Sequence, residues 1–258
     1  MNYQTIRLGM RDSIAVLTLS RPDVMNALNT QMRAEIAHAV TVAETSARVL
    51  VITGKGRAFC SGQDLGDRAN AGDIDLERTL RDEYVPMLRA IFDCTIPTIA
   101  AVNGAAAGAG ANLALACDVV IASESAVFLQ AFTRIGLIPD AGGTYWLPRQ
   151  VGVARAMGAA LFAEPVSARQ AADWGMIWES VPEDDFADHW YGQAAKLASG
   201  PTAAYARVKQ AIRGSFENTL EEQLALEAHL QGESGKTRDF KEGVLAFLEK
   251  RPANYEGR

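Results

Sequence analysis

Cysteine and histidine are scarce in this chain, whose 258 residues include only three of each. The cysteines are Cys60, Cys94 and Cys117. Their number is odd and their spacing matches no zinc pattern, so we expect free, buried thiols in a protein from a reducing compartment. No histidine has a second histidine or a cysteine nearby in the sequence. A histidine-based metal site and a Ser-His-Asp triad are therefore disfavoured, and we expect no metal.

Positive charge and long apolar runs are also lacking. The formal net charge is −6, and lysine and arginine form no dense cluster. Nucleic-acid binding is disfavoured, because neutralising phosphates requires clustered positive charge. The most apolar stretch, 96–117, is interrupted by Pro97, Asn103 and several glycines, so it is not a plain membrane span. The N-terminus does not have the pattern of a signal peptide, and we expect a cytoplasmic protein.

Hydrophobic periodicity divides the chain into two halves. Its length allows one large domain, or one domain with an appended tail. The first half alternates predicted strands and helices, which indicates an α/β protein. The predicted strands are 14–19, 49–53, 96–102 and 119–122, and the predicted helices are 30–43 and the latter part of 66–93. The second half is nearly all helical, with helices predicted at 144–158, 167–174, 184–198, 201–214, 219–232 and 237–250. The last two carry mixed charge and narrow apolar stripes, which is typical of helices that pack on another subunit.

Three segments combine glycines with polar residues at the ends of predicted elements. They are 56–65 (GRAFCSGQDL), 102–113 (VNGAAAGAGANL) and 136–144 (GLIPDAGGT). In the second, the glycines allow close approach of the backbone, and a helix is predicted to begin near Ala109. Free N–H groups there, with another from the Ser-Gly-Gln-Asp loop, could form an oxyanion hole. Close helix–strand packing is the alternative. A Rossmann fingerprint is disfavoured, because Leu113 stands at its last glycine position.

Asp140 is the most prominent carboxylate in these segments. It follows Pro139 and precedes Ala141-Gly142-Gly143, so a turn or helix-cap role is an alternative to a catalytic one. Asp64 and Asp118 are weaker candidates, because each could simply accept hydrogen bonds from local backbone.

These segments, in this order and spacing, resemble the crotonase (enoyl-CoA hydratase/isomerase) superfamily. Two further motifs extend the resemblance over essentially the whole chain: 21–28 (RPDVMNAL), and 238–243 (RDFKEG) with 247–251 (FLEKR). The resemblance implies an α/β fold, a crotonase-like spiral of ββα units over 1–200, followed by a helical trimerisation region over 201–258. It also implies a homotrimer or dimer of trimers. The implied substrate is an acyl-CoA thioester, so no separate cofactor is needed.

The resemblance also implies site residues. The thioester carbonyl would lie between the backbone N–H groups of Gln63 and Ala109, while Asp140 would be the catalytic carboxylate. The implied substrate-binding residues are Val24, Asn26, Ala27, Ser61, Gly62, Asp64, Leu65, Gly108, Gly110, Asn112, Phe132, Pro139, Phe247 and Lys250. Phe247 and Lys250 would reach the adenine end of CoA bound to a neighbouring subunit.

Departures from the family pattern narrow the implied reaction. Family hydratases use two glutamates, and those positions here carry Asn112 and Phe132. Neither side chain can exchange protons, so addition of water by paired carboxylates is disfavoured. One carboxylate, Asp140, is sufficient for a 1,3-proton shift through an enolate. Within the superfamily, the chain is most similar to the branch that converts 1,2-epoxyphenylacetyl-CoA to oxepin-CoA in phenylacetate catabolism. The segments that carry this similarity are 59–64 (FCSGQD), 106–110 (AAGAG), 136–140 (GLIPD), 155–157 (RAM) and 174–178 (WGMIW). Alternatives are a linear 3-enoyl-CoA to 2-enoyl-CoA isomerase, a hydrolase or dehalogenase with Asp140 as nucleophile, and a non-catalytic acyl-CoA-binding relative.

Overall fold

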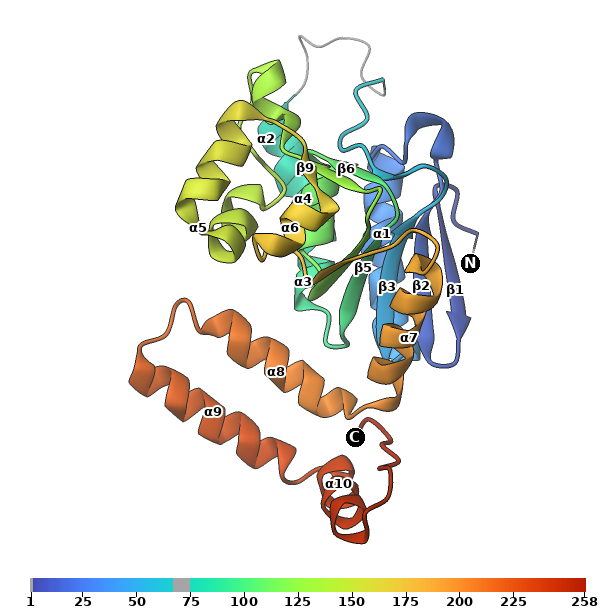
Figure 1. Cartoon of the computed structure of the whole chain (residues 1–258), viewed down its shortest axis with the longest axis vertical. Coiled ribbons are helices and arrows are strands. Elements are labelled where there is room, and N and C mark those ends of the chain that lie inside the picture. Colours follow the sequence, from blue (N-terminus) through green and yellow to red (C-terminus); the bar gives the residue numbers. More distant parts are fainter. Residues whose placement is uncertain (1, 67–74) are drawn as a thin grey trace.

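Two β-sheets and their covering helices form the body of the protein in the computed structural model, which describes residues 2–66 and 75–258 (Figure 1). The described strands are β1 (Ile6–Arg11), β2 (Ile14–Leu19), β3 (Val49–Gly54), β4 (Ala58–Cys60), β5 (Thr98–Val102), β6 (Ala105–Ala107), β7 (Val119–Ser123), β8 (Val127–Leu129), β9 (Val166–Ser167) and β10 (Glu179–Val181). The described helices are η1 (Pro22–Val24), α1 (Thr30–Ser46), α2 (Leu76–Thr79), η3 (Leu80–Tyr84), α3 (Val85–Asp93), α4 (Ala109–Leu115), η4 (Ala131–Ile135), α5 (Gly143–Phe162), α6 (Ala168–Asp173), α7 (Phe186–Ser199), α8 (Thr202–Gly214), α9 (Leu220–Ser234) and α10 (Arg238–Glu249).

Three pairs of consecutive strands are divided between the two sheets. The larger sheet has the order β1-β2-β3-β5-β7-β10, and the smaller one β4-β6-β8-β9. In the pairs β3/β4, β5/β6 and β7/β8, the first strand joins the larger sheet and the second joins the smaller one. From β2 to β10 the larger sheet is parallel, as is the smaller sheet from β4 to β8. This arrangement is the spiral of ββα units that the sequence predicted.

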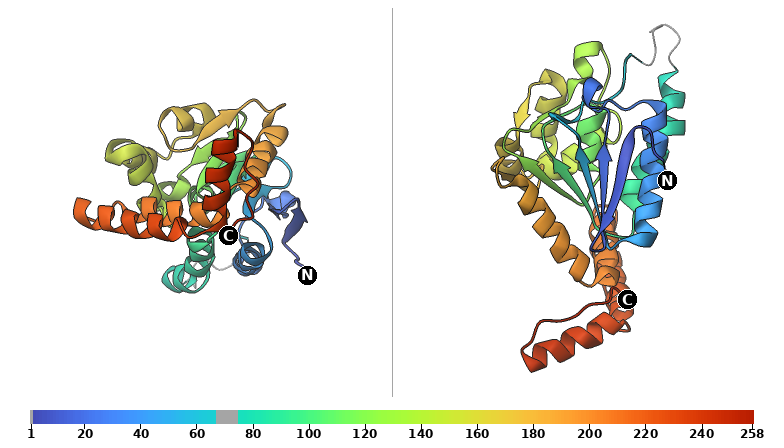
Figure 2. Two further views of the ribbon diagram at one scale, coloured as in Figure 1. Left: turned by 90° about the horizontal axis from the view of Figure 1, so that it is seen from below. Right: turned by 90° about the vertical axis from the view of Figure 1, so that its right-hand side faces the viewer.

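The larger sheet is buried on both faces, which explains its nearly continuous apolar strands. In β3, Leu50 and Ile52 lie in the core shared with α1, whereas Val49 and Val51 lie in the core shared with α7. Figure 2 shows the sheet from the side, between blue α1 and orange α7. Helix α1 begins after Asn29, whose side chain accepts a hydrogen bond from the Met32 N–H, as an N-cap residue does.

The predicted elements are confirmed, with small shifts at their ends. Strands β2, β3, β5 and β7 and helices α1 and α5 to α10 appear where the periodicity placed them. Ser167 caps α6 as expected, since its hydroxyl accepts from the Gln170 N–H. The predicted polar stretch before α2 falls on 67–74, which lie outside the described residues. Strands β9 and β10 correct the prediction of a nearly all-helical second half. They were missed because two or three residues are too few to show an alternating pattern.

Helices α8 to α10 extend away from the sheets as a helical arm, residues 201–258 (Figures 1 and 2). Two cations on α8 hold this arm to the body. Nζ of Lys209 lies 2.8 Å from the Asp118 carboxylate and donates to the Ile96 carbonyl oxygen, while Arg213 lies 2.6 Å from Asp118. Asp118 therefore anchors the arm to the end of the sheet.

Across the described ranges, no helix combines the length and apolarity that crossing a membrane requires. Cys60, Cys94 and Cys117 are free and buried, as expected.

Candidate active site

Two chain segments meet at the carboxyl end of the smaller sheet. Strands β4 and β6 are parallel neighbours, with Cys60 paired to Ala106, so the segments that follow them lie side by side. A Cβ atom on Gly62 would lie 2.8 Å from the carbonyl oxygen of Ala107 and 3.4 Å from the Ala109 nitrogen. A Cβ on Gly110 would lie 2.3 Å from the Cys60 carbonyl oxygen. Glycine is therefore required for the two segments to approach this closely.

Two backbone N–H groups at this junction have no protein acceptor among the described residues. Gln63 forms a parallel bridge with Leu28, but the ladder bonds use the carbonyl of Gly62 and the N–H of Asp64. The N–H of Gln63 is thus left outside the ladder. Ala109 is the first residue of α4, where N–H groups have no partner within the helix. Both donors, with the positive end of the α4 dipole, suit a developing oxyanion.

Asp140 lies between η4 and α5, and hydrogen bonds to its backbone carbonyl oxygen hold it in place. Its carbonyl oxygen accepts from Nδ2 of Asn112 at 2.7 Å and from the Gly143 N–H at 2.8 Å. Because Asn112 lies one turn after Ala109 on α4, this contact places Asp140 beside the helix that carries the second N–H donor. The side chain of Asp140 is free of such bonds: its Oδ1 is buried without a partner in the described chain. This carboxylate is thus available to a reacting group.

Burial raises the pKa of Asp140 to about 6. Tyr84 and Cys60 interact electrostatically with each other, and Tyr84 also interacts with Asp140. Burial raises the pKa of the Tyr84 phenol and takes the pKa of the Cys60 thiol to about 12, so both stay neutral near pH 7. A carboxylate with a pKa close to neutrality is suited to taking up a proton and returning it.

This raised pKa predicts the pH dependence of catalysis. A base must be ionised, so kcat/KM should reach a plateau above pH 7 and fall about tenfold per pH unit well below pH 6. Measuring kcat/KM from pH 4.5 to 8.5 in the free enzyme's stable range checks this. An apparent pKa near 4, the ordinary value of an exposed aspartate, would contradict the burial of the catalytic base.

Phe132 covers the glycine-rich segment. An added Cβ on Gly108 would lie 3.7 Å from Cζ of the Phe132 ring. The ring is buried, as is Pro139, the residue before Asp140. An apolar ring therefore lies close to the Ala109 end of the site.

Asn26 binds the loop around β4 through its side chain. It is fully buried, and its Nδ2 donates to the carbonyl oxygens of Lys55, Ala58 and Phe59 at 3.0, 2.8 and 3.2 Å. Its Oδ1 accepts from the N–H of Arg21 at 2.9 Å. These bonds hold the loop around β4, and the expected substrate contact of Asn26 stays a prediction.

The neighbouring predicted residues belong to the same loop cluster. Ser61 donates from Oγ to the Val24 carbonyl oxygen at 3.2 Å. The Asp64 carboxylate lies 2.7 Å from Nη1 of Arg21 and also accepts from the Gly66 N–H at 3.0 Å. Asp64 therefore stabilises the turn that presents Gln63. Ala27 is buried, whereas Val24 and Leu65 are exposed to solvent and free to contact a ligand.

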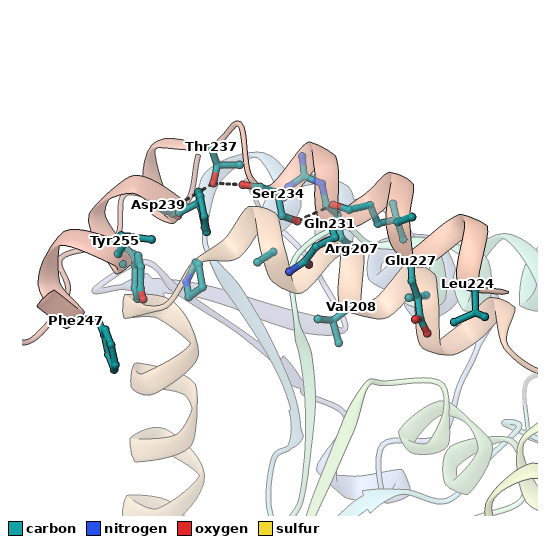
Figure 3. A pocket seen from close by; sticks show the side chains of 18 of the residues that line it. Arg207, Val208, Leu224, Glu227, Gln231, Ser234, Thr237, Asp239, Phe247 and Tyr255 are labelled. Carbon is teal, nitrogen blue, oxygen red and sulfur yellow. Dashed lines mark hydrogen bonds between the residues drawn. The ribbon is translucent and has the colours of Figure 1, made fainter.

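Phe247 and Lys250 lie elsewhere in the chain. Phe247 is on α10 and lines a groove of about 940 Å³ between the three helices of the arm (Figure 3). Its side chain is almost fully exposed, and Lys250 ends α10 in the left-handed conformation. Within one chain the arm lies apart from α4 (Figure 1). The expected contact with CoA on a neighbouring subunit stays a prediction.

Sequence reasoning missed two buried side chains at the site. Tyr84 ends the π-helical turn η3. Its hydroxyl accepts from Nη1 of Arg33 at 3.4 Å, and the Arg33 guanidinium stacks on its ring. Gln130, directly after β8, donates from Nε2 to Oδ1 of Asn112 at 2.9 Å. A polar residue following a short apolar stretch is the only sequence signal for Gln130, and it is a weak one.

Comparisons with known proteins show the family of this chain. The family model described as enoyl-CoA hydratase/isomerase matches residues 9–258. A protein of Rhodobacter capsulatus named probable enoyl-CoA hydratase is 62% identical, covering 100% of both chains. The 1,2-epoxyphenylacetyl-CoA isomerase of Escherichia coli is 45% identical over 95% of each chain. The crystal structure of an enoyl-CoA hydratase from Bacillus anthracis superposes with a TM-score of 0.92 at 32% identity, covering 99% of this chain and 100% of that one. This chain therefore belongs to the enoyl-CoA hydratase/isomerase family, within the crotonase superfamily.

Proposed function

We propose that this enzyme isomerises 1,2-epoxyphenylacetyl-CoA to oxepin-CoA by an enolate-mediated proton shift. The observation that carries the proposal is that, among the described residues, one carboxylate is available at the site. Asp140 has a buried, unpartnered oxygen and a pKa raised to about 6, whereas the positions of the two hydratase glutamates hold Asn112 and Phe132. The 45% identity to a protein named 1,2-epoxyphenylacetyl-CoA isomerase supports the choice of substrate.

The proton shift assigns a step to each group. Asp140 takes a proton from the carbon beside the thioester carbonyl, and the bonding electrons move to the carbonyl oxygen. The N–H groups of Gln63 and Ala109 stabilise this enolate, and donors of this kind are worth about 3–4 kcal/mol each. The epoxide then rearranges to the seven-membered ring, and Asp140 returns the proton to the γ carbon. The product is an isomer of the substrate, and water is not consumed.

Water addition has less support, although the 62% identical relative is named a probable hydratase. Hydration by this family's route needs a second group that activates water. Both polar atoms of the Asn112 amide are already bound to protein, to Asp140 and to Gln130, and Phe132 is apolar. Neither side chain can therefore deprotonate or orient a water molecule.

A linear 3-enoyl-CoA is the second candidate substrate, because its conversion to a 2-enoyl-CoA uses the same removal and return of a proton. The buried Phe132 ring, where a charged side chain would otherwise lie, favours an aromatic acyl group, since it lowers the cost of desolvating an apolar ring.

A competition assay between the two substrates tests the choice. We expect kcat/KM for 1,2-epoxyphenylacetyl-CoA to exceed that for a linear 3-enoyl-CoA. If the linear substrate is preferred tenfold or more, about 1.4 kcal/mol of transition-state free energy, the enzyme is a fatty-acid enoyl isomerase. Binding of acyl-CoA with neither reaction would instead support the non-catalytic alternative.

We further propose that the chain assembles as a homotrimer or dimer of trimers through the helical arm and needs no separate cofactor. The arm supports this, because it exposes Phe240, Val244, Phe247 and Leu248 on α10, and a surface of this kind is typical of subunit interfaces. The free, buried cysteines are in line with a reducing, cytoplasmic location. A monomer in light scattering at micromolar concentration would contradict the assembly.

A further inference from the structure

The carboxamides of Asn112 and Gln130 form a chain of hydrogen bonds that ends on the main chain of Asp140. Nε2 of Gln130 donates to Oδ1 of Asn112 at 2.9 Å, and Nδ2 of Asn112 donates to the Asp140 carbonyl oxygen at 2.7 Å. We propose that this amide relay is a positioning device: Gln130 orients Asn112, and Asn112 fixes the turn that carries the catalytic carboxylate. The proposal rests on the proposed function, because it assumes that Asp140 moves the proton.

The direction of the relay follows from the chemistry of its end point. A backbone carbonyl can only accept, so Asn112 must present its NH₂ group to Asp140. Its Oδ1 then faces the other way and needs a donor, which the NH₂ end of Gln130 supplies in the part of the chain that the structure describes. Each amide therefore has one productive orientation, and the second amide determines that of the first.

The relay lies in a dry and crowded environment. Asn112 is fully buried and Gln130 is 5% exposed, so water cannot readily replace a missing bond. A Cβ on Gly143 would lie 2.5 Å from Nδ2 of Asn112, and the Gly143 N–H donates to the same Asp140 carbonyl oxygen. The carbonyl is thus held from α4 and from the start of α5 together, which leaves the Asp140 main chain little freedom.

The other end of Gln130 makes no bond to protein. Its Oε1 is buried and unpartnered among the described residues, so the side chain contributes hydrogen bonding to the fold only through Asn112. Replacing Gln130 by methionine, which has a similar shape and no amide, removes the bond to Asn112, which is the one hydrogen bond that the Gln130 side chain makes to the described residues. The Gln130→Met substitution therefore tests the bond to Asn112 without removing other hydrogen bonds of the fold.

The relay can be tested by following deuterium exchange at the carbon beside the thioester. The probe is phenylacetyl-CoA in deuterium oxide, for which exchange requires removal of this proton but no ring rearrangement. For Gln130→Met we expect kcat for exchange to fall about tenfold, because small displacements of a catalytic group reduce rates strongly, while KM changes less than about twofold. Gln150→Met is the matched control: its Oε1 is also buried and unpartnered, but it lies outside the relay, and its exchange rate should be unchanged.

A double-mutant cycle separates positioning from a loss of folded protein. If Gln130 acts through Asp140, then adding Gln130→Met to Asp140→Asn should not reduce the residual exchange further. A full tenfold additional loss in the double variant would show a merely structural role and overturn the relay. Wild-type exchange in Gln130→Met would overturn the relay and leave the proposed function standing, whereas absence of exchange in the unmodified enzyme would overturn both.

Discussion

Asp140→Asn should lower kcat for isomerisation by at least about 100-fold, in line with the contribution of a general acid–base group. The substitution preserves the shape of the side chain and removes a carboxylate whose pKa burial raises to about 6. The hydrogen bonds that place residue 140 use its backbone carbonyl oxygen, so they survive the substitution. Acyl-CoA affinity, measured by titration calorimetry, should therefore change little.

The stability of this variant provides an internal control. Burial raises the pKa of Asp140 above that of an unfolded aspartate, so the ionised form destabilises the folded state at a pH above the folded pKa of about 6. The neutral asparagine should consequently raise Tm at pH 8 and have little effect near pH 4. Asp93→Asn, on the surface of α3, should leave both turnover and Tm nearly unchanged. Near-normal turnover by Asp140→Asn would contradict its assignment as the proton carrier.

Ala109→Pro should reduce kcat/KM by about 10² to 10³-fold, the effect of losing one oxyanion-hole donor. Proline lacks the N–H, and its ring carbon occupies the place of the missing hydrogen. The position nevertheless suits proline, because Ala109 is the first residue of α4, where proline is favoured in helices. A folded variant is therefore expected, which circular dichroism can verify before the kinetics.

Two substitutions that keep the N–H groups serve as controls for the oxyanion hole. Ala109→Gly and Gln63→Ala each change the side chain and retain the backbone donor, so both should remain within a few-fold of the unmodified enzyme. If Gln63→Ala in folded protein is as damaging as Ala109→Pro, the Gln63 side chain is the active group. A backbone oxyanion hole would then be wrong.

The elements that sequence predicts well are those long enough to show a period. Strand β3 reads as a continuous apolar run because both faces are buried, and α1 shows its buried face at Met32, Ile36 and Ala43. Strands β4 and β6 have three residues each, too few to distinguish from a loop. These short strands nevertheless bring Gly62 and Ala109 together. The central geometry of the site thus depends on elements that periodicity alone cannot reveal.

The candidate site was predictable to the extent that it consists of backbone in recognisable motifs. The glycine-rich segments and Asp140 stand in the order that the family shares, and the structure brings Gln63, Ala109 and Asp140 to the same end of the smaller sheet. Gln130 could not be found in this way. Its bond to Asn112 joins residues 18 positions apart and exists only because β6 and β8 are neighbours.

The central claim is that a single carboxylate moves a proton and that water is not added. The most direct measurement compares two reactions of the purified enzyme: rearrangement of 1,2-epoxyphenylacetyl-CoA, and hydration of crotonyl-CoA to 3-hydroxybutyryl-CoA. The account predicts that kcat/KM for rearrangement exceeds that for hydration by at least about 100-fold, the contribution of one general acid–base group. Hydration that is as fast as rearrangement would show that a group other than a paired carboxylate activates water, and would contradict the account.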